Sequence, residues 1–276
     1  MDLLTEEEVH YVLAGKTTEH IESMEHFMLD QPQVEIPVQE RFINGMYARE
    51  IVIPKGTLMT GRVYKEGYLD IMLSGDIAVA TPQGTRRMTG ANIMEAPPGR
   101  KRAGYAFEDT RWITVHRTDH YQEGDMVDRL TFFSMEQYRD YVRQRDHASY
   151  LAVLEMAGMT EDQVQAQVQN ESDRVELKQP YSEFVTVALS YLHGNGLKAC
   201  RDFEIGEVVG PARTAEGGRT IIGRYSNHSA NPNAIMELAE DNSVWAVATR
   251  KINMGDEITT HYGLTLQSIQ GALCQE

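Results

Sequence analysis

The sequence has little cysteine: Cys200 and Cys274 are the two in 276 residues. This number excludes a disulfide framework and a structural zinc site with four cysteine ligands, and it favours a reducing compartment. The chain also lacks a run of about 18 apolar residues, so we expect no membrane-spanning helix. Its N-terminus, MDLLTEEEVHYV, is acidic and lacks the basic start and apolar core of a signal peptide. The sequence therefore predicts a cytoplasmic protein.

Basic residues are also in the minority. Lys and Arg number 26 against 41 Asp and Glu, which gives a net charge of −15 and argues against non-specific nucleic-acid binding. The charge is uneven, because residues 1–40 carry −9, residues 41–118 carry +5 and residues 119–180 carry −7. Swings of this size indicate separate structural units.

The chain alternates between helical and β-rich patterns. Residues 1–40 predict an acidic helical arm, with a capping box at Thr5–Glu8, for packing or oligomerisation. Short β-rich runs separated by Gly and Pro turns follow in residues 46–118, and Ser74–Asp76 is predicted as a hairpin turn. The pattern becomes helical again from Ser134. Strands return after residue 181.

Three C-terminal segments carry polar residues in a notable order. The first is Gly194-Asn195-Gly196, where two glycines let the backbone approach a ligand closely. The second is residues 224–233, RYSNHSANPN, and the third is residues 251–263, KINMGDEITTHYG. Each alone could be a polar turn, with Tyr262 as a core tyrosine. Their joint presence favours a functional site.

In this order the segments resemble the SET domain of S-adenosylmethionine-dependent protein lysine methyltransferases. That family has a G-x-G, then R-(F/Y)-x-N-H-S-x-x-P-N, then G-E-E-(L/I)-x-x-x-Y, and the likeness covers roughly residues 181–263. The resemblance implies a fold in which one segment is threaded through a loop as a pseudoknot. It also implies S-adenosylmethionine as the cofactor and no metal.

The resemblance further implies roles for single residues. Backbone groups of the G-x-G would line the amino-acid end of the cofactor, and the N-H pair would hold its adenosine and carboxylate parts. The implied cofactor-binding residues are Gly194, Asn195, Gly196, Arg224, Asn227 and His228.

Two tyrosines would serve the reaction. Tyr262 would be the family's catalytic tyrosine, beside the sulfonium and the lysine amine, and Tyr225 would be an aromatic residue near the substrate channel. Methyl transfer to a neutral amine needs alignment more than acid–base groups. A desolvated aromatic channel lowers the pKa of a lysine because it disfavours the charged form.

The chain departs from larger relatives in two ways. Ala230 stands where many eukaryotic members have a cysteine, and no cysteine cluster follows, so closure of the site by zinc is not expected. Residues 264–276 are expected instead to form a short helix over the site. Fourteen residues separate Val209 from Arg224, a minimal substrate-reading insertion similar to that of compact bacterial and phage-type SET proteins. If phage-encoded, the protein would reside in the host cytoplasm or the virion.

The β-rich segment resembles a cupin-type jelly roll. Where metal-binding cupins place His and Glu ligands, this chain has Gly61, Val63 and Arg102, so we expect no metal site. His116 and His120 lack a third ligand. A predicted basic cluster could be a solvated rim, an anion pocket, or a dock for an acidic arm such as residues 1–30. Its members are Arg86, Arg87, Arg100, Lys101 and Arg102.

Together these observations predict a mostly β fold with helical arms. The expected order is an acidic arm (1–40), a cupin-like jelly-roll barrel (41–118), a helical connector (119–180) and a SET domain (181–276). The expected function is S-adenosylmethionine-dependent N-methylation of a lysine in an unidentified protein substrate, without nucleic-acid or membrane partners. The arm and barrel could form a homo-oligomer.

Two alternatives remain open. In the first, the chain is a structural or assembly protein, of a virus for example, whose degenerate SET fold and barrel serve interaction rather than catalysis. In the second, it is a cupin-type small-ligand binder with the SET domain as an accessory.

Overall fold

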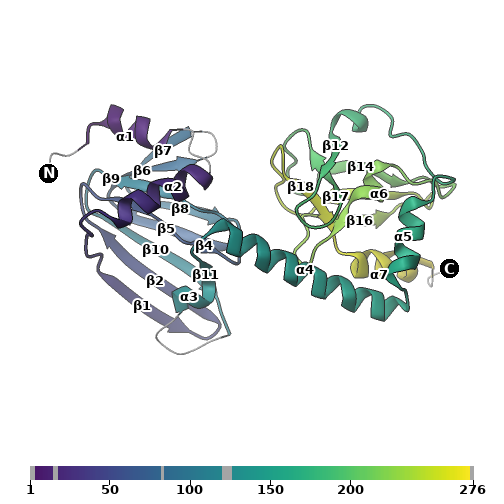
Figure 1. The fold of residues 1–276 in the computed structure, drawn as a ribbon, viewed down its shortest axis with the longest axis horizontal. Helices are drawn as coiled ribbons and strands as arrows, with labels where there is room; N and C mark the ends of the chain where they lie inside the picture. Colours follow the sequence, from purple (N-terminus) through teal and green to yellow (C-terminus); the bar gives the residue numbers. More distant parts are fainter. Residues whose placement is uncertain (1–3, 15–17, 82–83, 120–125, 274–276) are drawn as a thin grey trace. The chain divides into compact units, whose positions relative to one another are not determined.

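The computed structural model describes residues 4–14, 18–81, 84–119 and 126–273. The chain forms two compact units, unit 1 (Met1–Tyr138) and unit 2 (Arg139–Glu276) (Figure 1). Helix α4 (Met135–Ala157) runs across the boundary between them. No helix in the described ranges is long and apolar enough to span a lipid bilayer.

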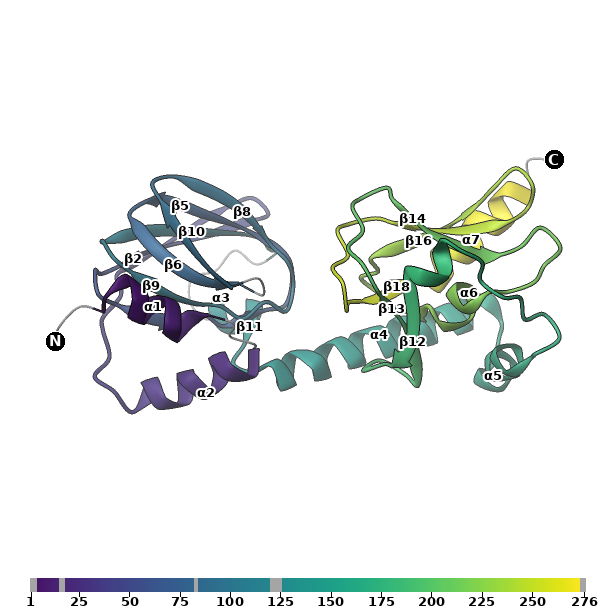
Figure 2. The same ribbon diagram turned by 90° about the horizontal axis from the view of Figure 1, so that it is seen from above.

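Unit 1 is built on two antiparallel sheets (Figure 2). In spatial order, the first sheet contains β1 (Val38–Ile43), β2 (Met46–Ile53), β10 (Thr110–Arg117), β5 (Tyr68–Ser74) and β8 (Asn92–Ala96). The second contains β3 (Leu58–Thr60), β9 (Ala103–Ala106), β6 (Asp76–Thr81) and β7 (Gly84–Thr89). A short ribbon pairs β4 (Val63–Tyr64) with β11 (Thr131–Phe132), which follows α3 (Met126–Leu130).

The two sheets share an apolar core. Ile51, Met72 and Trp112 of the first sheet pack with Ile77 and Met88 of the second. Such burial of facing side chains is the main favourable contribution to folding. Among the described residues, no strand of one sheet pairs with a strand of the other. The mostly β, jelly-roll-like prediction is confirmed, but the expected barrel is not closed.

The predicted hairpin turn at Ser74–Asp76 is wrong. Strand β5 ends at Ser74 in the first sheet, and β6 begins at Asp76 in the second. Gly75 has φ +117°, and a Cβ at this position would clash with Thr110. Only glycine tolerates this combination. The segment is therefore a corner that carries the chain from one sheet to the other.

The N-terminal arm consists of α1 (Glu6–Leu13) and α2 (Thr18–Leu29), as expected. The capping box is confirmed, because the Glu8 amide donates to Thr5 Oγ1 at 3.3 Å and the Thr5 amide donates to Glu8 Oε2 at 2.8 Å. Val9, Leu13 and Ile21 pack on the outer face of the second sheet. The arm thus packs against its own unit.

The predicted basic cluster does not form one surface. Arg87 pairs with Glu6 of the arm at 2.6 Å, and buried Lys101 pairs with Glu25 of the arm at 2.8 Å. Arg102 instead points into the sandwich, where it pairs with Asp70. Two of the five residues therefore dock the acidic arm, and another serves the interior.

The helical connector follows its capping signals. Helix α4 begins after Ser134, whose Oγ accepts from the Gln137 amide at 3.3 Å, and it ends before Gly158, which has φ +62°. A second capping box, at Thr160 and Gln163, starts α5 (Glu161–Gln169). Local sequence therefore fixed both ends of α4.

Unit 2 has a four-stranded and a three-stranded sheet. The first has the order β12 (Val185–Leu189), β13 (Asn195–Ala199), β18 (Glu257–Thr260) and β15 (Asn227–His228). The second has the order β14 (Val208–Arg213), β17 (Val244–Ala248) and β16 (Ala234–Leu238). The helical segments are η1 (Tyr181–Glu183), α6 (Ile221–Tyr225) and α7 (Tyr262–Leu273).

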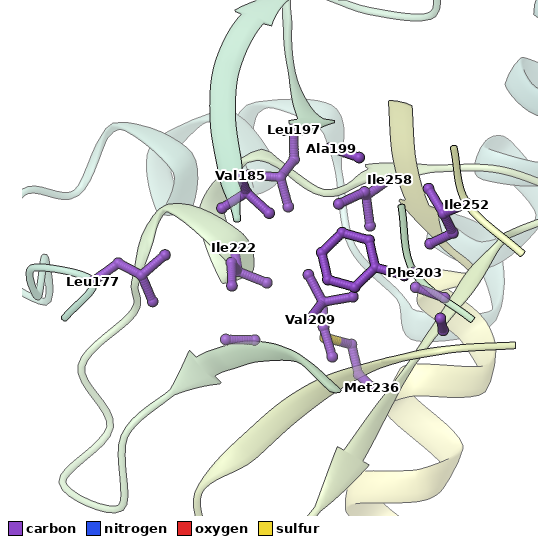
Figure 3. Close-up of a cluster of buried hydrophobic side chains, with 14 of the residues drawn as sticks. Leu177, Val185, Leu197, Ala199, Phe203, Val209, Ile222, Met236, Ile252 and Ile258 are labelled. Atoms are coloured by element: carbon purple, nitrogen blue, oxygen red, sulfur yellow. The ribbon is translucent and has the colours of Figure 1, made fainter. Parts of the chain in front are cut away.

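A single apolar core holds these sheets together (Figure 3). Leu197, Phe203, Ile222, Ile252 and Ile258 are all completely buried in it. Strands β15 and β18 pair in parallel, which requires a long connection between them. This pairing brings the second and third polar segments side by side.

Candidate functional site

The three polar segments meet at the side chain of Asn227. Its amide nitrogen lies 3.1 Å from the carbonyl oxygen of His193, 3.2 Å from that of Asn195 and 2.9 Å from Glu257 Oε1. One residue of the second segment thus holds the loop of the first and the strand of the third. The structure brings Gly194, Asn195 and Gly196 to this junction together with Asn227.

Glu257 is the buried acid at this junction, and the sequence analysis gave it no role. Its side chain accepts a hydrogen bond from Ser190 Oγ at 2.6 Å and pairs with Lys198 Nζ at 3.2 Å. Gly196 faces the carboxylate directly, and a Cβ there would clash with Glu257 Oε1. Gly196 is therefore required for packing, whereas a Cβ at Gly194, which has φ +52°, would meet open space.

Tyr262 begins helix α7 beside the second segment. Its hydroxyl donates to the carbonyl oxygen of Ser226 at 3.0 Å, and its backbone amide donates to His228 Nδ1 at 3.2 Å. Burial raises the pKa of the Tyr262 phenol to about 12. The phenol is therefore protonated at neutral pH, with its proton directed to a fixed acceptor.

His228 joins the same group through both ring nitrogens. Since Nδ1 accepts from the Tyr262 amide, the ring proton resides on Nε2, which lies 2.9 Å from Ser149 Oγ. Burial and the neighbouring His261 ring lower the pKa of His228 to about 4. His228 is therefore a neutral imidazole at pH 7.

Four aromatic rings lie close together around His228. We call Tyr150, His228, His261 and Tyr262 the aromatic cluster. The ring centroid of Tyr150 lies 6.1 Å from that of Tyr262 and 6.1 Å from that of His228. The His261 ring lies 4.8 Å from the His228 ring. Sequence reasoning missed Tyr150 and Ser149 because they belong to α4, far from the motifs along the chain.

The contacts of Arg224 and Tyr225 lie outside the Asn227 junction and the aromatic cluster. The Arg224 side chain is 2% exposed, and its guanidinium donates to the carbonyl oxygens of Val168 and Asn170, each at 2.7 Å. It also pairs with Asp173 at 2.9 Å, so these partners all belong to the end of α5 and the segment that follows it. Tyr225 packs against the core of unit 2. Their predicted roles at the site remain predictions.

Metal ligation has no support in the described ranges, which contain no group of three His, Cys, Asp or Glu side chains able to hold an ion. His116 is buried in unit 1 and stacks on tyrosines. His120 and Cys274 lie outside the described residues.

Burial of neutral His228 makes the stability of unit 2 depend on pH. Its pKa of about 4 lies below the unfolded value of about 6.5, so the unfolded state binds more protons between these values. We expect the free energy of unfolding to fall as the pH drops from 6.5 to 4, by at most about 1.4 kcal/mol per pH unit. Urea unfolding at pH 7.5, 6 and 5 measures this slope.

The matched control is His147, which is exposed on α4 in the same unit. His228→Gln should flatten the slope, whereas His147→Gln should leave it as in the parent protein. Equal slopes in all three proteins would contradict the assignment of His228.

Comparison of the whole chain with known protein families identifies its family. The family model described as SET domain matches residues 45–263. The chain belongs to the SET-domain family. The match extends beyond the C-terminal segment that suggested it and begins in unit 1. SET-domain proteins are generally methyltransferases and typically use S-adenosylmethionine.

Several solved structures are similar to about a third of the chain. A cupin superfamily protein from Desulfitobacterium hafniense is 9% identical, with a TM-score of 0.28 over 33% of this chain and 84% of that chain. KdgF from a Halomonas species is 18% identical, with a TM-score of 0.28 over 33% of this chain and 88% of that chain. A cupin-2 domain protein from Shewanella frigidimarina is 11% identical, with a TM-score of 0.26 over 35% and 92%. No curated protein matches the sequence of this SET-domain chain.

Proposed function

We propose that unit 2 is an S-adenosylmethionine-dependent protein-lysine N-methyltransferase. The observation that carries the proposal is the meeting of three distant segments, in which Asn227 ties the G-x-G loop to Glu257 while Tyr262 and His228 bond to each other alongside. Family membership supplies the reaction class, and the junction supplies candidate residues for it.

The residues present fit the cofactor. Neutral aromatic faces attract cations, and the aromatic cluster contains a protonated phenol and an uncharged imidazole at Tyr262 and His228. A charged histidine there would repel a sulfonium. The backbone around Gly194 and Gly196 would hold the amino-acid end, and Asn227 and His228 would shape the rest of the site. When bound, the cofactor supplies an electrophilic methyl group on a sulfonium sulfur.

Tyr262 acts by orientation rather than as a base. Its pKa of about 12 keeps the phenol protonated, so it does not remove a proton from the lysine at neutral pH. Its proton is directed to the Ser226 carbonyl oxygen, which leaves phenol lone pairs to accept from an amine N–H. The amine loses its own proton to solvent, helped by aromatic surroundings that disfavour the ammonium form. Alignment of the amine then lowers the barrier.

The other predicted residues take supporting roles. Arg224 is a positioning residue that holds the segment after α5, and Tyr225 borders the substrate channel. The substrate is a protein lysine within a basic segment, because the net charge of −15 attracts positive partners.

Titration of S-adenosylmethionine into the full chain by calorimetry tests the proposal. We expect binding by the parent protein and a loss of binding in Asn227→Ala, which releases the G-x-G loop. Asn253→Ala is the matched control, since the Asn253 side chain bonds to Asp256 in an exposed turn. Transfer of a labelled methyl group into a proteome extract then tests activity and reveals the substrate.

Absence of both binding and transfer would contradict the enzyme and favour the structural or assembly protein. Equal binding by Asn227→Ala and Asn253→Ala would contradict the junction as the cofactor site.

A further inference from the structure

The inner face of the first sheet of unit 1 changes from apolar to polar along its strands. At one end Trp112 lies opposite Ile51 and Met72. Two residues further along β10, Thr114 lies opposite Arg49 of β2 and Asp70 of β5. We use the term inner polar cluster for the side chains gathered at this second end. They are Arg49, Tyr64, Tyr68, Asp70, Arg100, Arg102 and His116.

Positive charge exceeds negative charge in the inner polar cluster. Asp70, 1% exposed, is its single carboxylate; it pairs with Arg102 and accepts from Trp112 Nε1 at 2.8 Å. In the described part of the chain, neither Arg49 nor Arg100 has a carboxylate within ion-pair distance. Burial and the nearby Arg102 charge lower the pKa of Arg100. Within the cluster Asp70 thus faces three arginines, and Glu40, which lies opposite Arg49 on β1, accepts instead from the Tyr47 hydroxyl.

Several guanidinium donors in the cluster lack acceptors. Arg49 Nε, Arg102 Nε and Arg102 Nη2 are buried and have no hydrogen-bond partner among the described residues. A buried donor without an acceptor costs about 1–3 kcal/mol, and more when it is charged. Proteins rarely retain several such donors together unless something satisfies them. An anion with two or more oxygens would both accept these N–H groups and balance the charge.

The cluster also has an aromatic wall, which borders a cleft. The His116 ring stacks on the rings of Tyr64 and Tyr68, each at 4.7 Å between centroids. Burial and the Arg49 charge lower the pKa of His116 to about 4, so this wall is uncharged. A cleft of about 370 Å³ adjoins this wall, and Tyr64 and His116 line it together with Glu66, Arg117 and Asp119. Its volume suits a small molecule.

We propose that the inner polar cluster binds a small organic carboxylate, with its oxygens on Arg49 and Arg102 and its remainder against Tyr64 and His116. Arginine forks match the planar, two-oxygen geometry of a carboxylate. Phosphate shares the charge but has tetrahedral oxygens and no carbon skeleton to cover the rings. The site is separate from the proposed methyl-transfer site and does not depend on it.

Malonate, with phosphate and chloride at matched ionic strength, is the probe for this site. In the full chain we expect malonate to raise the midpoint of thermal unfolding of unit 1 saturably, by several degrees, and chloride not to do so. Malonate should also shift the NMR signals of the His116 ring and leave those of the His261 ring in place. A saturable effect of phosphate with none from malonate would overturn the carboxylate assignment, and no saturable effect from either would overturn the site.

Two variants test the arginines. Arg49→Met should abolish the malonate response, and Arg102→Lys, which keeps the charge beside Asp70 but loses the fork, should weaken it at least tenfold. Arg111→Met is the control, since this arginine lies on β10 but pairs with Glu50 on the outer face. If Arg49→Met does not fold, the His116 signals of the parent protein decide the question. A parent-like response in both Arg49→Met and Arg102→Lys would overturn the proposal.

Discussion

Tyr262→Phe is expected to reduce methyl transfer by about 100-fold or more while S-adenosylmethionine still binds. The substitution keeps the ring in the aromatic cluster and removes one oxygen, which donates to the Ser226 carbonyl and is proposed to accept from the lysine amine. The loss should appear in kcat because it concerns alignment of the amine. Single-turnover transfer and calorimetry measure the two effects separately.

Tyr181→Phe is the matched control for this prediction. Tyr181 packs on Trp245 and Phe184 in the same unit, away from the aromatic cluster. Its substitution by phenylalanine also removes a single hydroxyl oxygen. It should transfer methyl groups at the parent rate. Transfer by Tyr262→Phe at that rate would refute the role of the hydroxyl, and loss of cofactor binding in Tyr262→Phe would show that the tyrosine serves binding instead.

Arg224→Met is expected to lower the free energy of unfolding of unit 2 by at least about 2 kcal/mol. The buried guanidinium satisfies the carbonyl oxygens of Val168 and Asn170, and methionine would leave both without this donor. The carboxylate partners Glu171 and Asp173 are partly exposed and can be hydrated again, so the cost lies mainly in losing the buried guanidinium and its hydrogen bonds to the two carbonyl oxygens. Urea unfolding followed by a signal of unit 2 measures the change.

Arg174→Met provides the comparison, because Arg174 also pairs with Glu171 but is exposed. Its cost should stay within about 0.5 kcal/mol. Should Arg224→Met leave stability unchanged and weaken cofactor binding instead, Arg224 would be a direct cofactor ligand, and its assignment as a positioning residue would be wrong.

Local signals in the sequence predicted local structure well. Capping residues at Thr5, Ser134 and Thr160 marked helix starts, because a cap is a hydrogen bond between neighbours in sequence. The corner at Gly75 was misread because a glycine turn looks the same whether the next strand returns to the same sheet or enters another. That choice depends on contacts with Thr110, which lies far along the chain.

In the candidate site, too, local sequence motifs were predicted and contacts between distant residues were not. Its motifs could be recognised in the sequence because their residues lie close together along the chain, as in Asn227-His228. Ser149 and Tyr150 could not be recognised as site residues, since a serine and a tyrosine on a long polar helix form no pattern that predicts contact with His228. Arg49 and Asp70 were missed for a related reason: alternation along a strand shows which residues face inward, but not that unpaired charges gather there.

The contact between Gly196 and the Glu257 carboxylate links two positions that are distant in the chain. A side chain at position 196 would force the acid out of its place, and a shorter residue at position 257 would leave space behind the loop. The two positions should therefore be inherited as a pair. Among diverged copies of this gene, a larger residue at 196 should accompany a smaller one at 257, and exchange of one alone should be rare.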